Sequence, residues 1–145
     1  MPDLTLAQAT IIVDKALEQG RALKLRPLTV AVLDAGGHPR ALKVEDGSSL
    51  LRHQIATGKA WGALGMGMAS RRLVERAKNN PAFVNSLTQM AGGLFVPVPG
   101  GVLIRDSAGA LLGAVGISGD TSDRDEECAV AGIRAAGLVA DTGAE

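Results

Sequence analysis

The segment that decides the fold is GVLIRDSAGALLGAVGIS, residues 101–118. Two apolar runs, 102–105 and 110–118, flank the tetrad Asp106–Gly109, whose polar and Gly residues are typical of a tight turn. Strands joined by so short a turn pair antiparallel. The segment therefore predicts a β-hairpin, and we expect the rest of the sheet to form around it.

The remaining chain predicts further strands and a set of helices. Thr5 and Gln8 fit a capping box at the start of the first helix, and Ser48 or Ser49, and later Ser70, can cap two others. Helices packed on an antiparallel sheet define the α+β class, and a chain of 145 residues suggests a single domain spanning 1–145. The predicted strands are 28–33, 39–44, 94–98, 102–105 and 110–118; the predicted helices are 6–25, 50–64, 71–78, 82–90 and a last one with Val130, Ile133, Gly137 and Ala140 on one face.

The composition argues against several classes of function. Lys plus Arg number 15 and Asp plus Glu number 15, so the formal net charge is zero and we expect no nucleic-acid partner. Aromatic residues make up only 2%, too few for a base-stacking platform. Because the chain shows neither a signal-peptide pattern nor a membrane-spanning apolar run, we expect no membrane partner and a cytoplasmic location. Cys128 is predicted to be a small buried hydrophobic residue.

Five acids fall within SGDTSDRDEE, residues 118–127. An EF-hand loop needs acids at alternating positions, a Gly at the sixth and a Glu at the twelfth, and this spacing is absent. Acids in the first turn of a helix are stabilised by the free N–H groups and the helix macrodipole. The segment therefore predicts a helix start capped by Ser122 or Asp123, and no metal site is predicted here or elsewhere.

Lys59 is the strongest single candidate for chemistry, because its neighbours in the sequence are small and apolar. It lies on the predicted buried stripe of the second helix, marked by Leu51, Ile55 and Ala63. Its ammonium group could reach solvent while the stem packs on apolar surface. Alternatively it points into a pocket, binds a carboxylate and acts, if desolvated, as a base or nucleophile. The spacing leaves both alternatives open.

His38 and His53 are the only histidines. His38 is placed in the first hairpin turn and His53 on the second helix, and a surface position is the favoured interpretation of each. A single His can still bind a haem iron axially. The Gly-rich segments 62–67 and 113–119 lack the phosphate-loop pattern, so we expect them to allow close packing or to contact a planar ligand.

Three groups of blocks follow one another along the chain: VAVLDAGG (30–37) with Asp46-Gly47, Ile55-Ala56 with Lys59-Ala60, and PGGV (99–102) with Ile104, GAVGISG (113–119) and Asp125. These separate blocks, in matching order, make the chain resemble the GlcG/HbpS-like proteins, also called the haem-degrading domain family. The resemblance covers nearly the whole chain. It implies a profilin-like fold with a five-stranded antiparallel sheet and packed helices, homo-oligomers, and similarity to proteins that bind haem, iron or cobalamin. Haem is therefore a possible cofactor.

Two departures from the family pattern concern the expected site. Glu45 stands where the family often has Met, and Asp120 stands where it commonly has Gly. Asp120 adds a carboxylate beside the presumed pocket, so it is the residue most expected to give this chain a property its relatives lack. The positions that match the family's sites are Asp46, Lys59, Gly93, Ser118, Gly119 and Asp125.

Three hypotheses follow. The leading one is a homo-oligomeric protein that binds a small acidic ligand or a tetrapyrrole. The alternative is an isomerase, lyase or hydratase of a small organic acid, in which Lys59 with Asp46 or Asp125 moves a proton. The third is an assembly or regulatory subunit whose glycines serve packing. Beside these catalytic candidates, the predicted ligand-binding residues are Gly93, Arg105, Ser118, Gly119, Asp120 and His53, with Lys59 and Arg105 meeting the acidic groups.

Overall fold

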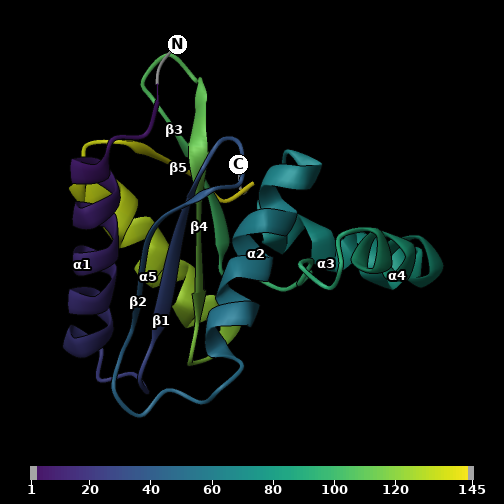
Figure 1. Cartoon of the computed structure of the whole chain (residues 1–145), viewed down its shortest axis with the longest axis horizontal. Coiled ribbons are helices and arrows are strands. Elements are labelled where there is room, and N and C mark those ends of the chain that lie inside the picture. Colours follow the sequence, from purple (N-terminus) through teal and green to yellow (C-terminus); the bar gives the residue numbers. More distant parts are fainter. Residues whose placement is uncertain (1–2, 144–145) are drawn as a thin grey trace.

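The computed structural model describes residues 3–143 and has three layers (Figure 1). A sheet forms the middle layer, α1 and α5 cover one face, and α2 covers the other. Two short helices, α3 and α4, project to one side of α2 as an arm. The elements are α1 (Leu6–Ala22), β1 (Thr29–Asp34), β2 (Pro39–Val44), α2 (Arg52–Met66), α3 (Ser70–Asn79), α4 (Pro81–Met90), β3 (Gly101–Arg105), β4 (Leu111–Ser118), α5 (Ser122–Ala135) and β5 (Val139–Asp141).

The strands form one open antiparallel sheet in the order β2-β1-β4-β3-β5. The predicted hairpin of residues 101–118 forms β3 and β4, and β4 lies at the centre of the sheet, where it pairs with both β1 and β3. The predicted α+β fold with a five-stranded antiparallel sheet is therefore confirmed. Among the described residues, no helix is long and apolar enough to cross a membrane.

The two faces of the sheet are packed differently. Because side chains alternate along a strand, Val30 and Val32 of β1 join the larger core under α1 and α5, whereas Leu33 joins a smaller one under α2. The α2 side is built mainly from Ala, including Ala60 and Ala114. These small side chains allow α2 to lie close to the sheet. Both faces of β1 and β4 are buried, which explains their continuous apolar sequences.

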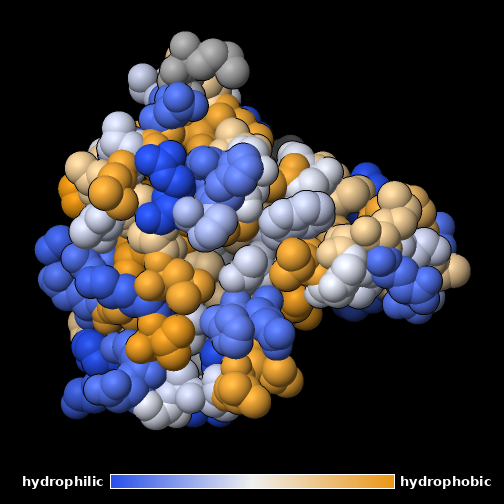
Figure 2. Space-filling model, viewed as in Figure 1, coloured by the Kyte–Doolittle hydropathy of each residue, from blue (hydrophilic) through white to orange (hydrophobic). Residues whose placement is uncertain are grey.

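The arm has its own small core and a charged attachment to the body. Leu73, Val84 and Phe95 form the core that joins α3, α4 and the following loop. Arg71 of α3 pairs with Glu126 of α5 at 2.9 Å. The outer surface keeps apolar side chains exposed, and Figure 2 shows hydrophobic residues in orange where the arm meets the body.

One predicted strand was wrong. Residues 94–98 form no strand, because Pro97 has no N–H to donate and the N–H of Val96 donates to Gly58 of α2 at 3.3 Å instead. The fifth strand is β5, which follows a last helix that is shorter than predicted. That helix ends at Ala135 because Gly137 takes the left-handed conformation, with φ 76°. Ala140 therefore lies in β5 and not on the helix.

The predicted helix starts were partly wrong. The capping box of Thr5 and Gln8 is confirmed. The cap of α5 is Thr121, which accepts from the N–H of Arg124, and not Ser122 or Asp123, which lie inside the helix.

The predicted caps of α2 and α3 were also wrong. Neither Ser48 nor Ser49 caps α2, which follows Leu51 and has no side-chain cap. Leu51 is 58% exposed, so it does not belong to the buried stripe. Ser70 lies inside α3 and accepts from the N–H of Gly101 at 2.7 Å, which fixes α3 to the start of β3.

Candidate functional site

Lys59 of α2 and Asp125 of α5 meet beside the end of β4. Lys59 Nζ lies 3.2 Å from Asp125 Oδ2 and donates to the carbonyl of Ile117 at 2.8 Å. The two side chains are only 3% and 1% exposed. Of the two alternatives that the sequence left open for Lys59, the one in which its ammonium group reaches solvent is therefore wrong. The carboxylate that it binds belongs to the protein itself. We call Lys59 and Asp125 the buried pair.

Burial dominates the electrostatics of the buried pair. It lowers the pKa of Lys59 against the opposite effect of Asp125, and it raises the pKa of Asp125 against the opposite effects of Lys59 and of the Asp120 N–H. That N–H donates to Asp125 Oδ1 at 3.0 Å. The hydrogen bonds compensate part of the desolvation cost, so loss of either partner would leave an uncompensated buried charge.

Glycines of β3 and β4 make room for α2 at the buried pair. A Cβ on Gly116 would clash with the carbonyl oxygen of Ala56, and one on Gly101 would clash with that of Lys59. Gly100 has φ 121°, a conformation that favours glycine, and its missing side chain leaves space for the Lys59 ammonium. The close-packing interpretation of residues 113–119 is therefore confirmed at Gly116.

Gly119 and Asp120 pack on the loop before β1. A Cβ on Gly119, which has φ 153°, would clash with the carbonyl oxygen of Pro27. Asp120 Oδ2 accepts from the N–H of Arg26 at 3.0 Å. The N–H groups of Arg26 and Thr121 lower the pKa of Asp120. Asp120 thus ties two loops together, and its role toward a ligand stays a prediction.

Ser118 is joined by a residue that the sequence did not single out. Arg52, in the first turn of α2, donates from Nη1 to Ser118 Oγ at 3.0 Å and from Nε to Ser49 Oγ at 3.1 Å. Ser118 is 1% exposed. The match to the family's blocks pointed to Ser118, but nothing in the sequence indicated which cation would contact it.

The other predicted site residues are not brought to the buried pair. Arg105 lies at the opposite end of β3, where it pairs with Asp141 at 2.9 Å. Asp46 lines a surface cavity of about 370 Å³ that also contains Arg21 and Glu45. Gly93 lies in the loop after α4 with φ 89°, and His53 is exposed in the first turn of α2.

Cys128 is buried, as predicted, and burial raises the pKa of its thiol to about 12, with help from Asp125 and Glu127. This thiol is therefore not ionised at neutral pH. Within residues 3–143, the structure contains no group of three or more His, Cys, Asp or Glu side chains placed to hold a metal ion.

Two apolar cavities that the sequence did not predict share Trp61 and Gly65. The larger, about 220 Å³, lies between α2 and α4, and the smaller, about 140 Å³, lies between α2 and the β1–β2 turn. We call the two together the Trp61 cleft. The one feature of the sequence that could have pointed to these cavities is the only Trp of the chain, which lies among glycines. The cleft is further lined by Met66, Leu87, Met90, Ala91 and Phe95 on one side and by Ala35, Gly36, Gly37 and Leu64 on the other.

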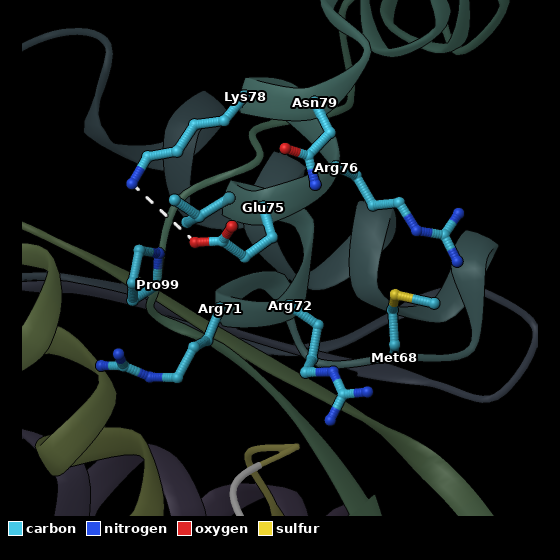
Figure 3. Close-up of a pocket in the computed structure, with 9 residues that line it drawn as sticks. Met68, Arg71, Arg72, Glu75, Arg76, Lys78, Asn79 and Pro99 are labelled. Atoms are coloured by element: carbon cyan, nitrogen blue, oxygen red, sulfur yellow. Dashed lines mark ion pairs between the residues drawn. The ribbon is translucent and has the colours of Figure 1, made fainter.

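A basic groove of about 690 Å³ runs along α3 (Figure 3). Its four cations outnumber its one acid, Glu75, which pairs with Lys78 at 3.8 Å. Figure 3 shows Arg76 pointing away from Arg71 and Arg72, so the cations do not converge on one point. The groove is a positively charged surface rather than a closed anion pocket. Its lining residues are Met68, Arg71, Arg72, Val74, Glu75, Arg76, Lys78, Asn79 and Pro99.

The fold and these sites define an α+β protein. Its charged pair is buried inside, and its cavities open on the surface around α2 and the arm. The chain belongs to the family described as haem-degrading protein HbpS-like, whose model matches residues 4–134. The resemblance proposed from the sequence blocks is therefore confirmed.

Similar proteins include members with named ligands or activities. The corrinoid adenosyltransferase PduO of Salmonella typhimurium is 28% identical over 120 residues, which cover 83% of this chain and 35% of PduO. The chain thus spans about a third of the length of this curated relative. The crystal structure of the PduOC:haem complex matches with a TM-score of 0.86 and 25% identity, covering 97% of this chain and 99% of that one. A double variant of HbpS from Streptomyces reticuli matches with a TM-score of 0.79 and 27% identity, covering 92% and 87%.

Proposed function

We propose that this protein binds a tetrapyrrole, with haem as the first candidate. The observation that carries the proposal is the match to the PduOC:haem complex, which extends over 97% of the chain with a TM-score of 0.86. A shared fold does not by itself specify a ligand. The proposal therefore also requires a surface of this chain that suits a flat, largely apolar molecule with acidic groups.

We propose that the Trp61 cleft provides this surface. Trp61 and Phe95 offer aromatic contacts, and Met66 and Met90 offer soft, adaptable ones. Ligand sites are typically concave and mostly apolar, with a few polar groups that fix orientation. The positive charge along α3 lies on the same arm and favours an anionic ligand. Haem, when bound, would supply the iron chemistry, and the chain's own residues would bind it and exclude water.

We assign the buried pair a structural role within this proposal. Lys59 donates to Asp125 and to the Ile117 carbonyl, and it lines none of the cavities described above. Asp46, its other proposed catalytic partner, lines a different cavity. The geometry thus offers no observation that favours proton transfer to a small organic acid over ligand binding.

We also propose that the arm pairs with a second copy of the chain. Met90 is 83% exposed and Phe83 is 42% exposed, and both lie on α4. Exposed apolar side chains gathered on one element indicate an interaction surface. A chain of zero formal net charge opposes self-association only weakly. Size-exclusion chromatography with light scattering should show that the wild-type protein is an oligomer and that the double variant Phe83→Ser with Met90→Ser is a monomer. A monomeric wild-type protein would contradict the proposed pairing of the arm.

The test of ligand binding is a titration of the purified haem-free protein with ferric haem. We expect a shifted Soret band that saturates at a fixed stoichiometry, and we expect Trp61→Ala to weaken binding. Leu50→Ala is the matched control, because Leu50 is 85% exposed and lies outside the Trp61 cleft. Circular dichroism checks that both variants fold. A wild-type titration without saturable binding would refute haem as the ligand.

A further inference from the structure

Arg52, at the start of α2, contacts hydroxyl groups but no carboxylate. Its Nη1 donates to Ser118 Oγ at 3.0 Å and its Nε donates to Ser49 Oγ at 3.1 Å. Within residues 3–143, no Asp or Glu forms an ion pair with Arg52. A guanidinium has more N–H donors than these two bonds use. Its charge and its remaining donors are therefore available to an anion.

Two further hydroxyls lie beside those that Arg52 contacts, and neither has a hydrogen-bond partner. Thr29 Oγ1 and Ser48 Oγ are the buried side-chain polar atoms without one in the part of the chain that the structure describes. Thr29 is 0% exposed and pairs with Ser118 across the sheet, so the two side chains are neighbours. Ser48 precedes Ser49 in the loop before α2. A buried hydroxyl without a partner is costly, so these two atoms point to a bound group.

The side chains of Thr29 and Ser118 point toward α2 rather than toward α1 and α5. Side chains two residues apart on a strand share a face, and a Cβ on Gly116 would meet the Ala56 carbonyl of α2. Ser118 therefore faces α2, as its bond to Arg52 also shows. Thr29, its cross-strand partner, faces the same way, and its hydroxyl lies under the first turn of α2.

The electrostatics at this end of α2 favour a ligand with one negative charge. The charge of Lys59 is balanced by Asp125 at 3.2 Å, whereas that of Arg52 is not balanced. Burial lowers the pKa of Lys59 most, and the charge of Arg52 lowers it further. α2 has no side-chain cap and no acid in its first turn, so its free N–H groups and macrodipole add positive potential.

The cluster is open to solvent beside exposed apolar side chains. Arg52 is half-buried and Ser49 is exposed. Leu50 and Leu51, which lie between them in the chain, are 85% and 58% exposed. Small-molecule sites combine a few polar groups that fix orientation with apolar surface around them. A carboxylate with a short apolar chain matches this combination.

We propose that Arg52 binds a small monocarboxylate, and that the hydroxyls of Thr29 and Ser48 donate to the same ligand. A carboxylate accepts paired N–H bonds from a guanidinium, and its other lone pairs accept from hydroxyls. Arg52 precedes Trp61 by nine residues on α2, about 14 Å along the helix axis. The site is therefore separate from the Trp61 cleft, and the inference goes beyond the proposed tetrapyrrole binding and does not depend on it.

The test is a nuclear magnetic resonance titration of the isotope-labelled, haem-free protein with sodium propionate. We expect the Arg52 Nε–H signal and the backbone N–H signals of the first turn of α2 to shift and to saturate. Propionamide, which has a similar shape and no charge, should not shift them. Inorganic phosphate, which carries more charge, should bind more weakly than propionate.

Variants assign the binding to named residues. Arg52→Gln should weaken propionate binding at least ~10-fold, because both the charge and the paired donors are lost. Thr29→Val, which removes one hydroxyl and keeps the shape, should weaken it ~5-fold. Arg134→Gln is the matched control, because it removes one charge from the last turn of α5, on the opposite face of the sheet. Circular dichroism checks that each variant folds.

The outcomes decide the proposal whether or not the protein binds haem. It is overturned if propionate produces no saturable shift in the wild-type protein, if propionamide produces the same shifts, or if phosphate binds more tightly than propionate. A folded Arg52→Gln variant with wild-type affinity also overturns it. If Arg52→Gln does not fold, Arg52→Lys replaces it. That variant keeps the charge without the planar fork, and unchanged affinity would overturn the assignment of Arg52.

Discussion

The buried pair and the Trp61 cleft are two very different regions of the molecule. In the sequence, Lys59 and Asp125 are candidate catalytic residues. In the structure their side chains are only 3% and 1% exposed, and they form an ion pair with each other. The Trp61 cleft is lined largely by residues that look like ordinary apolar positions, yet it opens on the surface. The difference teaches that a charged residue among apolar neighbours in the sequence can have a structural role inside the protein. A concave apolar surface, in contrast, can form from ordinary apolar residues that are distant in the sequence.

The largest expected effect comes from breaking the buried pair. Lys59→Met leaves the Asp125 carboxylate buried and unpaired, which typically costs about 3–5 kcal/mol of unfolding free energy. Burial raises the pKa of Asp125 above 3.8, so the folded state holds its proton more tightly than the unfolded state does. The cost should therefore be smallest below pH 3.8 and grow as pH rises through the raised pKa.

Urea unfolding of wild type and Lys59→Met at pH 4 and pH 7 measures this pH dependence. The double variant Lys59→Met with Asp125→Leu removes both charges and should recover most of the lost stability, because the desolvation cost disappears with them. A single variant as stable as wild type at pH 7 would mean that the pair is not the structural element described here.

A smaller loss should follow from filling the space between α2 and the sheet. Gly116→Ala forces a methyl group against the Ala56 carbonyl oxygen, and overpacking typically costs about 1–3 kcal/mol. Gly65→Ala is the control, because the added Cβ would lie 3.7 Å from Trp61, an ordinary contact, on an exposed helical position. Thermal unfolding should show a lower midpoint only for Gly116→Ala, and equal midpoints would contradict the close packing.

The smallest effect should come from the attachment of the arm. Arg71 is 40% exposed and pairs with Glu126, and such partly exposed ion pairs contribute about 0.2–1 kcal/mol. Arg71→Ala should increase amide hydrogen exchange in α3 while leaving the exchange of β4 unchanged. Lys15→Ala, which breaks an exposed pair within α1, is the control. Faster exchange spread evenly over the chain would argue against a separately attached arm.

The sequence predicted the sheet because its signals are local. Apolar runs and the turn at 106–109 specify β3 and β4, and the capping box specifies the start of α1. The fifth strand could not be predicted in this way. Val139–Asp141 is a three-residue strand defined by its pairing with β3, and such pairing leaves almost no pattern in the chain.

The site was predicted less well, because its partners are distant in the sequence. The matched blocks pointed to Lys59 and Asp125, and the structure does bring them together. Spacing could not show that the ammonium is buried, since this depends on Gly101 and Gly116 of other strands. It also could not place Arg105, which lies at the far end of β3.

The most direct test of the central claim compares haem binding by two variants. We expect Lys59→Met with Asp125→Leu, once shown to be folded, to keep the wild-type dissociation constant for ferric haem. Trp61→Ala should bind at least ~10-fold more weakly, because an aromatic contact contributes about 0.5–1.5 kcal/mol beyond its buried area and ~1.4 kcal/mol corresponds to tenfold. The opposite result, with binding lost in the double variant and kept in Trp61→Ala, would place the ligand at the buried pair and contradict the account.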